Sequence, residues 1–303
     1  MTSNPTENIT KSLPFGQSIL SLNQQSPTSY SGAPFDLGWK RLYGGHLIAQ
    51  SLLSSHLSSY VKGSLSSFHA CFLHIGNCRH TLNYSVAPLR IGRESSRVQV
   101  QAKQNNRFLF QIMASYTDTS SQQHGHNPQF PSVIEPEELE NDHEMLHTLL
   151  RDFPHSTGLK SFVQRRINTD TGLDIKPIFP NNFLHSEEKS TKRQLWFRMR
   201  SHIPQDLASL LLAYTSDFLL VGTSLQSHSL SILSPSVKFV SLDHSMWFYN
   251  ETPQNEWILM DAKSEVYTKG RSLVQGDFYT RNGIHIASCK QEGFFHIRDR
   301  VHT

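Results

Sequence analysis

The segment GGHLIAQSLLSSHLSSY, residues 44–60, decides the fold class. Its apolar residues recur at helical spacing, so one face of the predicted helix is apolar; they are Leu47, Ile48, Leu52, Leu53 and Leu57. Four segments with strand-like patterns follow, at residues 66–74, 81–89, 98–104 and 108–116. The last two are joined by Asn105–Asn106, a dipeptide typical of a tight hairpin turn. This order predicts a long helix followed by an antiparallel sheet.

The second half of the chain repeats this order. A predicted strand and an apolar helix come first, and four further strands follow; they span residues 194–200, 204–222, 238–250, 256–267, 272–280 and 284–297. Asn282–Gly283 is a second hairpin signal, 176 residues after the first (282 − 106 = 176). His244 follows His69 at almost the same distance (244 − 69 = 175). The recurrence predicts a duplicated α+β unit.

The segments around the two units predict the domain boundaries. Residues 1–33 are rich in Ser, Asn, Gln and Thr, so we expect a flexible N-terminal arm there. The first unit is assigned to residues 34–118 and the second unit to residues 173–303. Between them, residues 119–172 are predicted to form a linker that carries one helix, over residues 136–153.

Composition excludes several classes of function. The 303 residues include 28 Lys and Arg and 25 Asp and Glu, for a net charge of +3 without a basic cluster, so nucleic acid is not an expected partner. Three cysteines without a CxxC pair favour reduced thiols over a disulfide frame or a zinc knuckle. The most apolar segment, 207–222, is interrupted by polar residues and predicts no membrane span. Since no signal-like segment opens the chain, we expect a cytoplasmic protein.

One motif favours a metal-dependent alternative. His143, Glu144 and His147 match HExxH, which on a helix turns both histidines to one side, where they can bind zinc with the glutamate as general base. A chain with 17 histidines produces such a match easily by chance. The extension of the motif found in metzincins is absent, because Leu150 and Phe153 occupy its Gly and His positions. We favour a solvated helix face without a metal and keep a zinc-dependent hydrolase as the alternative.

Other catalytic motifs are missing, and three isolated polar residues take their place. No P-loop, GxGxxG or GxSxG segment occurs, and Cys71 and Cys289 lie in apolar strand segments, where we expect buried, inert thiols. Asp217 interrupts the apolar run LLLAYTSDFLLVG, which is costly unless the carboxylate has a partner or faces a wet cleft. Ser241 and Gln291 lie in predicted strands. From the residues alone, a structural role is the better expectation for each of the three.

Several longer segments carry a family resemblance. RLYGGHLIAQSL (41–52), SLDHSMWF (241–248), GRSLVQGDFYTRNG (270–283) and ASCKQEG (287–293) resemble the acyl-CoA thioesterase II family, and the similarity covers most of residues 35–297. The resemblance implies a tandem double hotdog, in which each unit is a long helix wrapped by an antiparallel sheet. It also implies that acyl-CoA is the substrate, hydrolysed to free fatty acid and CoA without a cofactor.

The resemblance also assigns candidate catalytic residues. The Asp, the Thr or Ser, and the Gln with which the family holds and activates one water fall on Asp217, Ser241 and Gln291. Many relatives have Thr at the position of Ser241, and the hydroxyl that the role needs is kept. We expect Asp217 to act as general base and the other two to fix the water. Backbone N–H groups at the start of the first helix, at Gly45 and His46, are the oxyanion candidates.

The CoA end of the substrate, the partners and the location are less defined. Lys269 and Arg271 are our candidates for contacts with the CoA phosphates. By analogy with other hotdog proteins we expect a homo-oligomer. The chain has no SKL-type tail, although peroxisomal relatives often carry one. The first half departs from the family pattern, for example at His46, where relatives have Gln. A non-catalytic double hotdog that binds acyl-CoA is therefore a further alternative.

Overall fold

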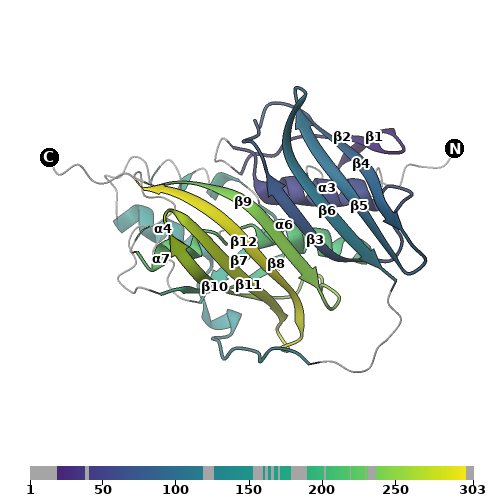
Figure 1. Cartoon of the computed structure of the whole chain (residues 1–303). Helices are drawn as coiled ribbons and strands as arrows, with labels where there is room; N and C mark the ends of the chain where they lie inside the picture. The colour runs from purple at the N-terminus through teal and green to yellow at the C-terminus, as the bar shows by residue number, and fades with distance from the viewer. Residues whose placement is uncertain are drawn as a thin grey trace.

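The strands of both halves of the chain join in one antiparallel sheet (Figure 1). The computed structural model describes residues 19–37, 41–118, 126–152, 160, 163–164, 167–169, 171–178, 190–200, 203–218, 220–228, 230 and 237–297. The first half contributes β1 (Leu22–Ser26), β2 (Ser29–Gly32), β3 (Ser64–Phe72), β4 (Leu82–Ile91), β5 (Ser95–Gln104) and β6 (Arg107–Thr117). The second contributes β7 (Leu173–Pro177), β8 (Lys192–Met199), β9 (Val237–Phe248), β10 (Ile258–Thr268), β11 (Arg271–Thr280) and β12 (His285–Ile297).

The strand order has an internal symmetry. It runs β1-β2-β4-β5-β6-β3 and then β9-β12-β11-β10-β8-β7, so each strand of the first half has a counterpart at the mirrored position. The halves meet where β3 pairs with β9 and His69 lies opposite Ser245, 176 residues apart (245 − 69 = 176). Register shifts at Ser66 in β3 and at Leu242 in β9 are also 176 residues apart (242 − 66 = 176). The predicted duplication and the tandem double hotdog are confirmed.

His69 and His244 do not occupy equivalent positions in the two units, contrary to the prediction from their spacing. The counterpart of His69 is Ser245, and His244 is offset from it by one residue. Because neighbouring strand residues point to opposite faces, His69 is exposed while His244 is buried. The hairpin turn at Asn105 and Asn106 is confirmed: both residues have positive φ, at 48° and 62°, as a two-residue hairpin turn requires.

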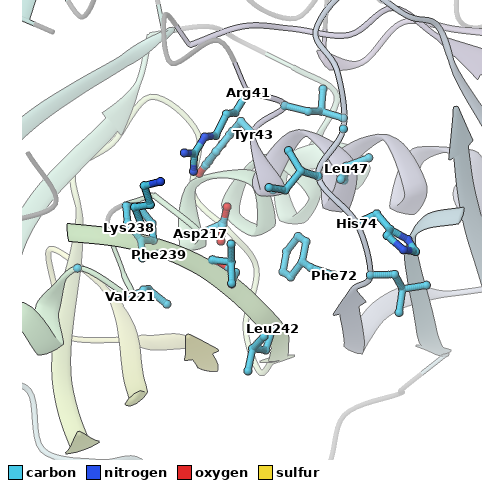
Figure 2. A pocket seen from close by; sticks show the side chains of 18 of the residues that line it. Arg41, Tyr43, Leu47, Phe72, His74, Asp217, Val221, Lys238, Phe239 and Leu242 are labelled. Carbon is cyan, nitrogen blue, oxygen red and sulfur yellow. The ribbon is translucent and has the colours of Figure 1, made fainter. Parts of the chain in front are cut away.

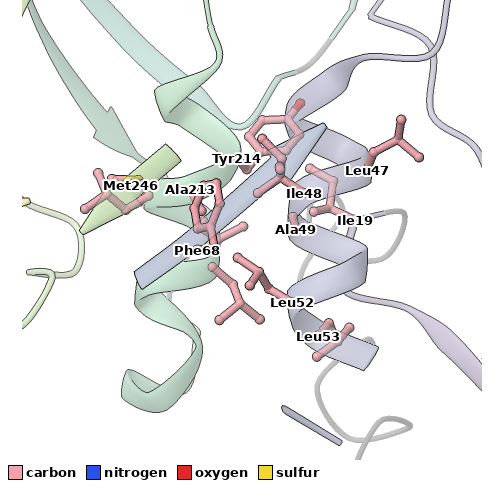
Figure 3. Close-up of a cluster of buried hydrophobic side chains, with 14 of the residues drawn as sticks. Ile19, Leu47, Ile48, Ala49, Leu52, Leu53, Phe68, Ala213, Tyr214 and Met246 are labelled. Carbon is pink, nitrogen blue, oxygen red and sulfur yellow. The ribbon is translucent and has the colours of Figure 1, made fainter. Parts of the chain in front are cut away.

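Two helices cover one face of the sheet, α3 (Gly44–His56) and α6 (Ala208–Ser216) (Figure 1). Between them and the sheet lies the main core, formed among others by Ile48, Ala49, Leu52, Phe68, Ala213, Tyr214 and Met246 (Figure 3). The helices approach very closely, because a Cβ at Gly45 would lie 2.3 Å from the carbonyl oxygen of Tyr214. The hydroxyl of Tyr43 donates to the same carbonyl at 2.7 Å. The start of α3 is therefore fixed against the end of α6.

The expected flexible arm is wrong for the part of it that the structure describes. Residues 22–32 form β1 and β2 at one edge of the sheet, and β2 pairs with β4. Leu22 and Tyr30 are buried, and Tyr30 lies opposite the buried Tyr84. The polar residues of β1 and β2 are ordered by backbone hydrogen bonds to the neighbouring strands. Amino-acid composition does not predict such backbone pairing. Residues 1–18 lie outside the described part.

Both predicted helices after the first are shorter than expected. In the first case a 3₁₀ turn (η1, Pro136–Glu138) is followed by α4 (Asp142–Asp152), because Asn141 caps a new helix. Residue 153 lies outside the described part. In the second, α6 follows a 3₁₀ turn (η2, Gln205–Leu207) and ends at Ser216 with Asp217 at its C-cap, and a separate short helix, α7 (Thr223–Gln226), comes after it.

The cysteines were predicted correctly in one case and wrongly in another. Cys289 is fully buried, and burial raises the pKa of its thiol. Cys71 is exposed, because it lies on the face of β3 that points away from the helices.

Among the described residues, no helix is long and apolar enough to cross a membrane.

The junction of the two units can be tested at β3. Phe68 is fully buried and stacks on the ring of His244, with centroids 5.6 Å apart. We expect Phe68→Ala to lower the free energy of unfolding by about 3–5 kcal/mol, because it leaves a cavity at the junction. Cys71→Ala, three residues along the strand on its exposed face, should change it by less than about 0.5 kcal/mol. Urea denaturation of both variants checks this, and equal losses would contradict the assigned faces.

Candidate active site

The three residues singled out by the resemblance meet at one point. The Gln291 side-chain Nε2 donates to Asp217 Oδ1 at 2.5 Å and to Ser241 Oγ at 3.0 Å. Asp217 and Ser241 line a pocket of about 500 Å³ between the two units, whose walls also include Phe72 and Phe239 (Figure 2). Gln291 is fully buried behind them and does not line the pocket. The arrangement presents a carboxylate and a hydroxyl to a cavity, with a buried amide between them.

A β-bulge turns Ser241 toward this site. Gln291 lies opposite His244, and Glu292 lies opposite Asp243, but Gly293 lies opposite Ser241, so Leu242 is an extra residue in β9. Strict alternation would have placed Ser241 and Asp243 on the same face of the strand. The extra residue shifts Ser241 to the helix-facing side, which is also the side of Gln291.

The Asp217 carboxylate is held by groups from both units. Its Oδ2 accepts the backbone N–H of Gly45 at 2.8 Å, at the N-terminus of α3, where the helix dipole favours a negative charge. Asp217 itself caps the C-terminus of α6, where a negative charge is disfavoured. Burial raises the pKa of Asp217 from 3.8 to about 7, and the hydrogen bonds from Gln291 and Gly45 only partly oppose this. A carboxylate in this range suits a general base at neutral pH.

The same contact removes the predicted oxyanion donors. The N–H of Gly45 is directed at Asp217, and the N–H of His46 donates to the carbonyl of Tyr43 at 3.2 Å. The His46 ring is buried away from the pocket, with Nε2 3.0 Å from the carbonyl oxygen of Ala33. Burial lowers the pKa of His46 to about 4. Gly45 therefore orients Asp217, and His46 belongs to the core.

The predicted CoA contacts also lie elsewhere. Lys269 lies in the turn between β10 and β11, Arg271 is the first residue of β11, and neither lines the pocket. Arg271 Nε donates to Glu292 Oε1 at 2.6 Å, on the face of β12 opposite to Gln291. The basic side chains that do line the pocket are Arg41 and Lys238 (Figure 2). Sequence pattern could not separate these cations, because it does not tell which of them has an acidic neighbour in space.

His244 is a site residue that the sequence analysis missed. It is buried directly opposite Gln291 on the neighbouring strand, and burial lowers its pKa to about 3, so its ring is neutral. The Ser216 hydroxyl donates to the carbonyl of Ala213, so the His244 Nε2–H donates to Ser216 Oγ, at 2.9 Å. His244 thus ties the strand that carries Ser241 to the helix turn just before Asp217. His244 could have been predicted as a site residue because it lies inside SLDHSMWF, a segment that carries the family resemblance.

The HExxH segment has a structural explanation. It lies in α4, where the Asn141 N–H donates to Glu144 Oε2 at 3.2 Å and the Glu144 N–H donates to Asn141 Oδ1 at 3.0 Å. This reciprocal pair is a capping box, so the glutamate of the motif stabilises the start of the helix. Within the described ranges, no three His, Cys, Asp or Glu side chains are grouped so that they could hold a metal ion.

Burial of the carboxylate predicts a pH-dependent stability. Because the pKa of Asp217 is raised in the folded state, its stabilising contribution is present below about pH 4 and is lost as pH rises through about 7. Asp217→Asn has no such loss. Between pH 5 and pH 8 we expect the free energy of unfolding of the variant to gain about 2 kcal/mol on that of the wild type. Denaturant titrations across this range check it, and parallel pH curves would contradict the raised pKa.

Comparison with known proteins identifies the family of this chain. The family described as acyl-CoA thioesterase N-terminal domain matches residues 34–118, and the one described as acyl-CoA thioesterase matches residues 168–294. The chain is 28% identical to acyl-CoA thioesterase 2 of Haemophilus influenzae over 283 residues, 93% of this chain and 96% of that one. It is 27% identical to human acyl-coenzyme A thioesterase 8 over 287 residues, 93% of this chain and 89% of that one.

Solved structures give the same fold. An acyl-CoA thioesterase II from Mycobacterium marinum superposes with a TM-score of 0.72 at 25% identity, covering 93% of this chain and 98% of that one. A hot dog protein from Alicyclobacillus acidocaldarius, 13% identical, gives 0.73 over 94% and 99% and supports the fold alone. With both units matched in sequence and the double hotdog matched in structure, the chain belongs to the acyl-CoA thioesterase II family.

Proposed function

We propose that this protein hydrolyses acyl-CoA to free fatty acid and CoA, with Asp217 as the general base that activates one water. The observation that carries the proposal is a carboxylate with a pKa raised to about 7 that faces a pocket beside a serine hydroxyl. The relatives named as acyl-CoA thioesterases support the same reaction. Neither a metal nor a nucleophilic side chain is needed, because a thioester carbonyl is already a good electrophile.

The reaction follows from the hydrogen-bond directions. Ser241 Oγ accepts an N–H from Gln291, so its own O–H can donate to the water. The water donates one hydrogen to Asp217 and keeps one lone pair for the thioester carbonyl carbon. As the new C–O bond forms, the proton passes to Asp217. When the C–S bond breaks, that proton passes to the sulfur of CoA, and the carboxylate is restored.

Gln291 has a positioning role in this scheme. Both hydrogens of its amide are engaged, one by Asp217 and one by Ser241. It therefore sets the distance between the two groups that contact the water. This revises the expectation that Gln291 itself would hold the water, because its side chain is buried behind the pocket wall.

We assign one reaction centre to the pair of units. In the first unit, Phe68 lies opposite Ala114, where the second has His244 opposite Gln291. Likewise, the residue just before the bulge is Leu65 in β3 of the first unit and Ser241 in β9 of the second. The first unit thus offers apolar side chains at these mirrored positions. Its contribution is the Gly45 amide and part of the pocket wall.

The cellular compartment and the oligomeric state of the protein are inferred from the sequence and from other hotdog proteins. We infer a cytosolic protein that assembles with copies of itself, as expected from the sequence and from hotdog proteins in general. The three free cysteines fit a reducing compartment. One relative, from Saccharomyces cerevisiae, is named a peroxisomal acyl-coenzyme A thioester hydrolase. Cell fractionation distinguishes the two compartments, and light scattering of the purified protein gives the number of subunits.

The general base can be tested by pH and by substitution. We expect kcat/KM for an acyl-CoA to fall about tenfold per pH unit below about pH 7, because protonated Asp217 cannot accept a proton. Asp217→Asn should lower kcat at least about a hundredfold at pH 8 while the protein stays folded. Thiol release from a series of acyl-CoA substrates measures both. Retained turnover in the folded variant would eliminate Asp217 as the base.

The hydroxyl can be tested separately. Ser241→Ala removes the donor to the water and should lower kcat about tenfold to a hundredfold, with KM changed less than about threefold. Ser241→Thr keeps the hydroxyl and should retain most of the activity. If Ala and Thr variants were equally active, a role for the hydroxyl would be excluded.

A further inference from the structure

Two cations without acidic partners face the active-site pocket. Arg41 lies just before α3 in the first unit, and Lys238 lies near the start of β9 in the second. Both side chains are exposed, both line the pocket that contains Asp217, and Figure 2 shows them on the same side of it. Among the residues that the structure describes, neither side chain forms a hydrogen bond or an ion pair, although the backbone of Lys238 pairs with β12.

Several other basic side chains on the surface do have acidic partners. Arg271 pairs with Glu292, Arg281 pairs with Glu135 and Glu137, and Arg198 pairs with Asp174. Those cations are neutralised in place. Arg41 and Lys238 instead leave an excess of positive charge at the pocket rim.

The rest of the pocket wall increases the effect of this charge. Arg41, Lys238 and Asp217 are the only Lys, Arg, Asp or Glu residues among those that line this pocket, and most of the others are apolar, including Leu47, Phe72, Val221, Phe239 and Leu242. A cleft with low-dielectric walls and one sign of charge at its rim concentrates the electric field and attracts counter-ions. Asp217 lies deeper and is buried, so it neutralises the rim little. An anion at the rim would relieve the repulsion between the two cations.

We propose that Arg41 and Lys238 together form a clamp for the phosphate groups of the CoA nucleotide, one cation from each unit. The inference rests on the proposed function and names the part of the site that recognises the leaving group. Arginine offers a planar fork of donors that suits phosphate oxygens, and lysine offers a compact charge. The clamp would orient the thioester so that its carbonyl lies at Asp217. It replaces Lys269 and Arg271 as the CoA contacts.

The test compares two thioesters of the same fatty acid, one of CoA and one of pantetheine, which lacks the nucleotide. Arg41→Gln and Lys238→Gln should each raise KM for the CoA thioester about tenfold, with kcat changed less than about twofold. KM for the pantetheine thioester should not change. Arg93→Gln and Lys263→Gln are matched controls, because Arg93 and Lys263 are exposed and outside the pocket, and they should leave both substrates unaffected. For the wild-type protein, raising the salt concentration should increase KM for the CoA thioester and leave KM for the pantetheine thioester unchanged.

A second measurement separates this inference from the proposed function. Binding of CoA itself, measured by calorimetry, should weaken about tenfold in each clamp variant even if no turnover is measured. If the wild-type protein hydrolysed neither thioester, the proposed function would fail while the binding comparison still tested the clamp. If the clamp variants changed both thioesters equally, or left CoA binding unchanged, the clamp would be refuted and the hydrolase would stand.

Discussion

The hydrogen bond from the Gly45 N–H to the Asp217 carboxylate is the contact on which the site depends. It joins the N-terminus of a helix in one unit to the C-cap of the matching helix in the other, so the site exists only where the two units pack together. The approach tolerates no side chain: a Cβ at Gly44 would lie 2.7 Å from Asp217 Oδ2, and one at Gly45 would lie 2.3 Å from the Tyr214 carbonyl oxygen. Two consecutive glycines thus set the depth at which the carboxylate is buried.

Burial and the surrounding hydrogen-bond donors together set the pKa of Asp217. A buried carboxylate without donors would be protonated at neutral pH, and one with many donors would be a weak base. Asp217 has one donor on each oxygen, Gly45 on Oδ2 and Gln291 on Oδ1, and its pKa is raised only to about 7. With both oxygens held, the carboxylate is directed at a proton on a bound water rather than at the carbonyl carbon itself. His244 supports the arrangement from behind through Ser216.

The sequence predicted the duplication, because the hairpin turns are local signals. The family resemblance predicted that Asp217, Ser241 and Gln291 share one site, and the structure brings their side chains together. The sequence could not predict the bulge at Leu242, which reverses the face of Ser241, because strand pattern alone implies strict alternation. It also missed the destination of the Gly45 amide, since a free helix N-terminus and an occupied one have the same sequence. The edge strands β1 and β2 were not predicted, because they are ordered by backbone pairing, of β1 with β2 and of β2 with β4. Pairing of Arg271 with Glu292 likewise depends on register.

The division of roles is tested most directly by following the oxygen atom that enters the product. A single turnover, with enzyme in excess over acyl-CoA in water enriched in oxygen-18, shows whether the oxygen that enters the fatty acid comes from water or from the Asp217 carboxylate. If Asp217 activates water, the first fatty acid released carries oxygen-18 and the peptide containing Asp217 carries none. An unlabelled first product, with oxygen-18 found in the Asp217 carboxylate, would mean that the carboxylate attacks the thioester and would contradict the account.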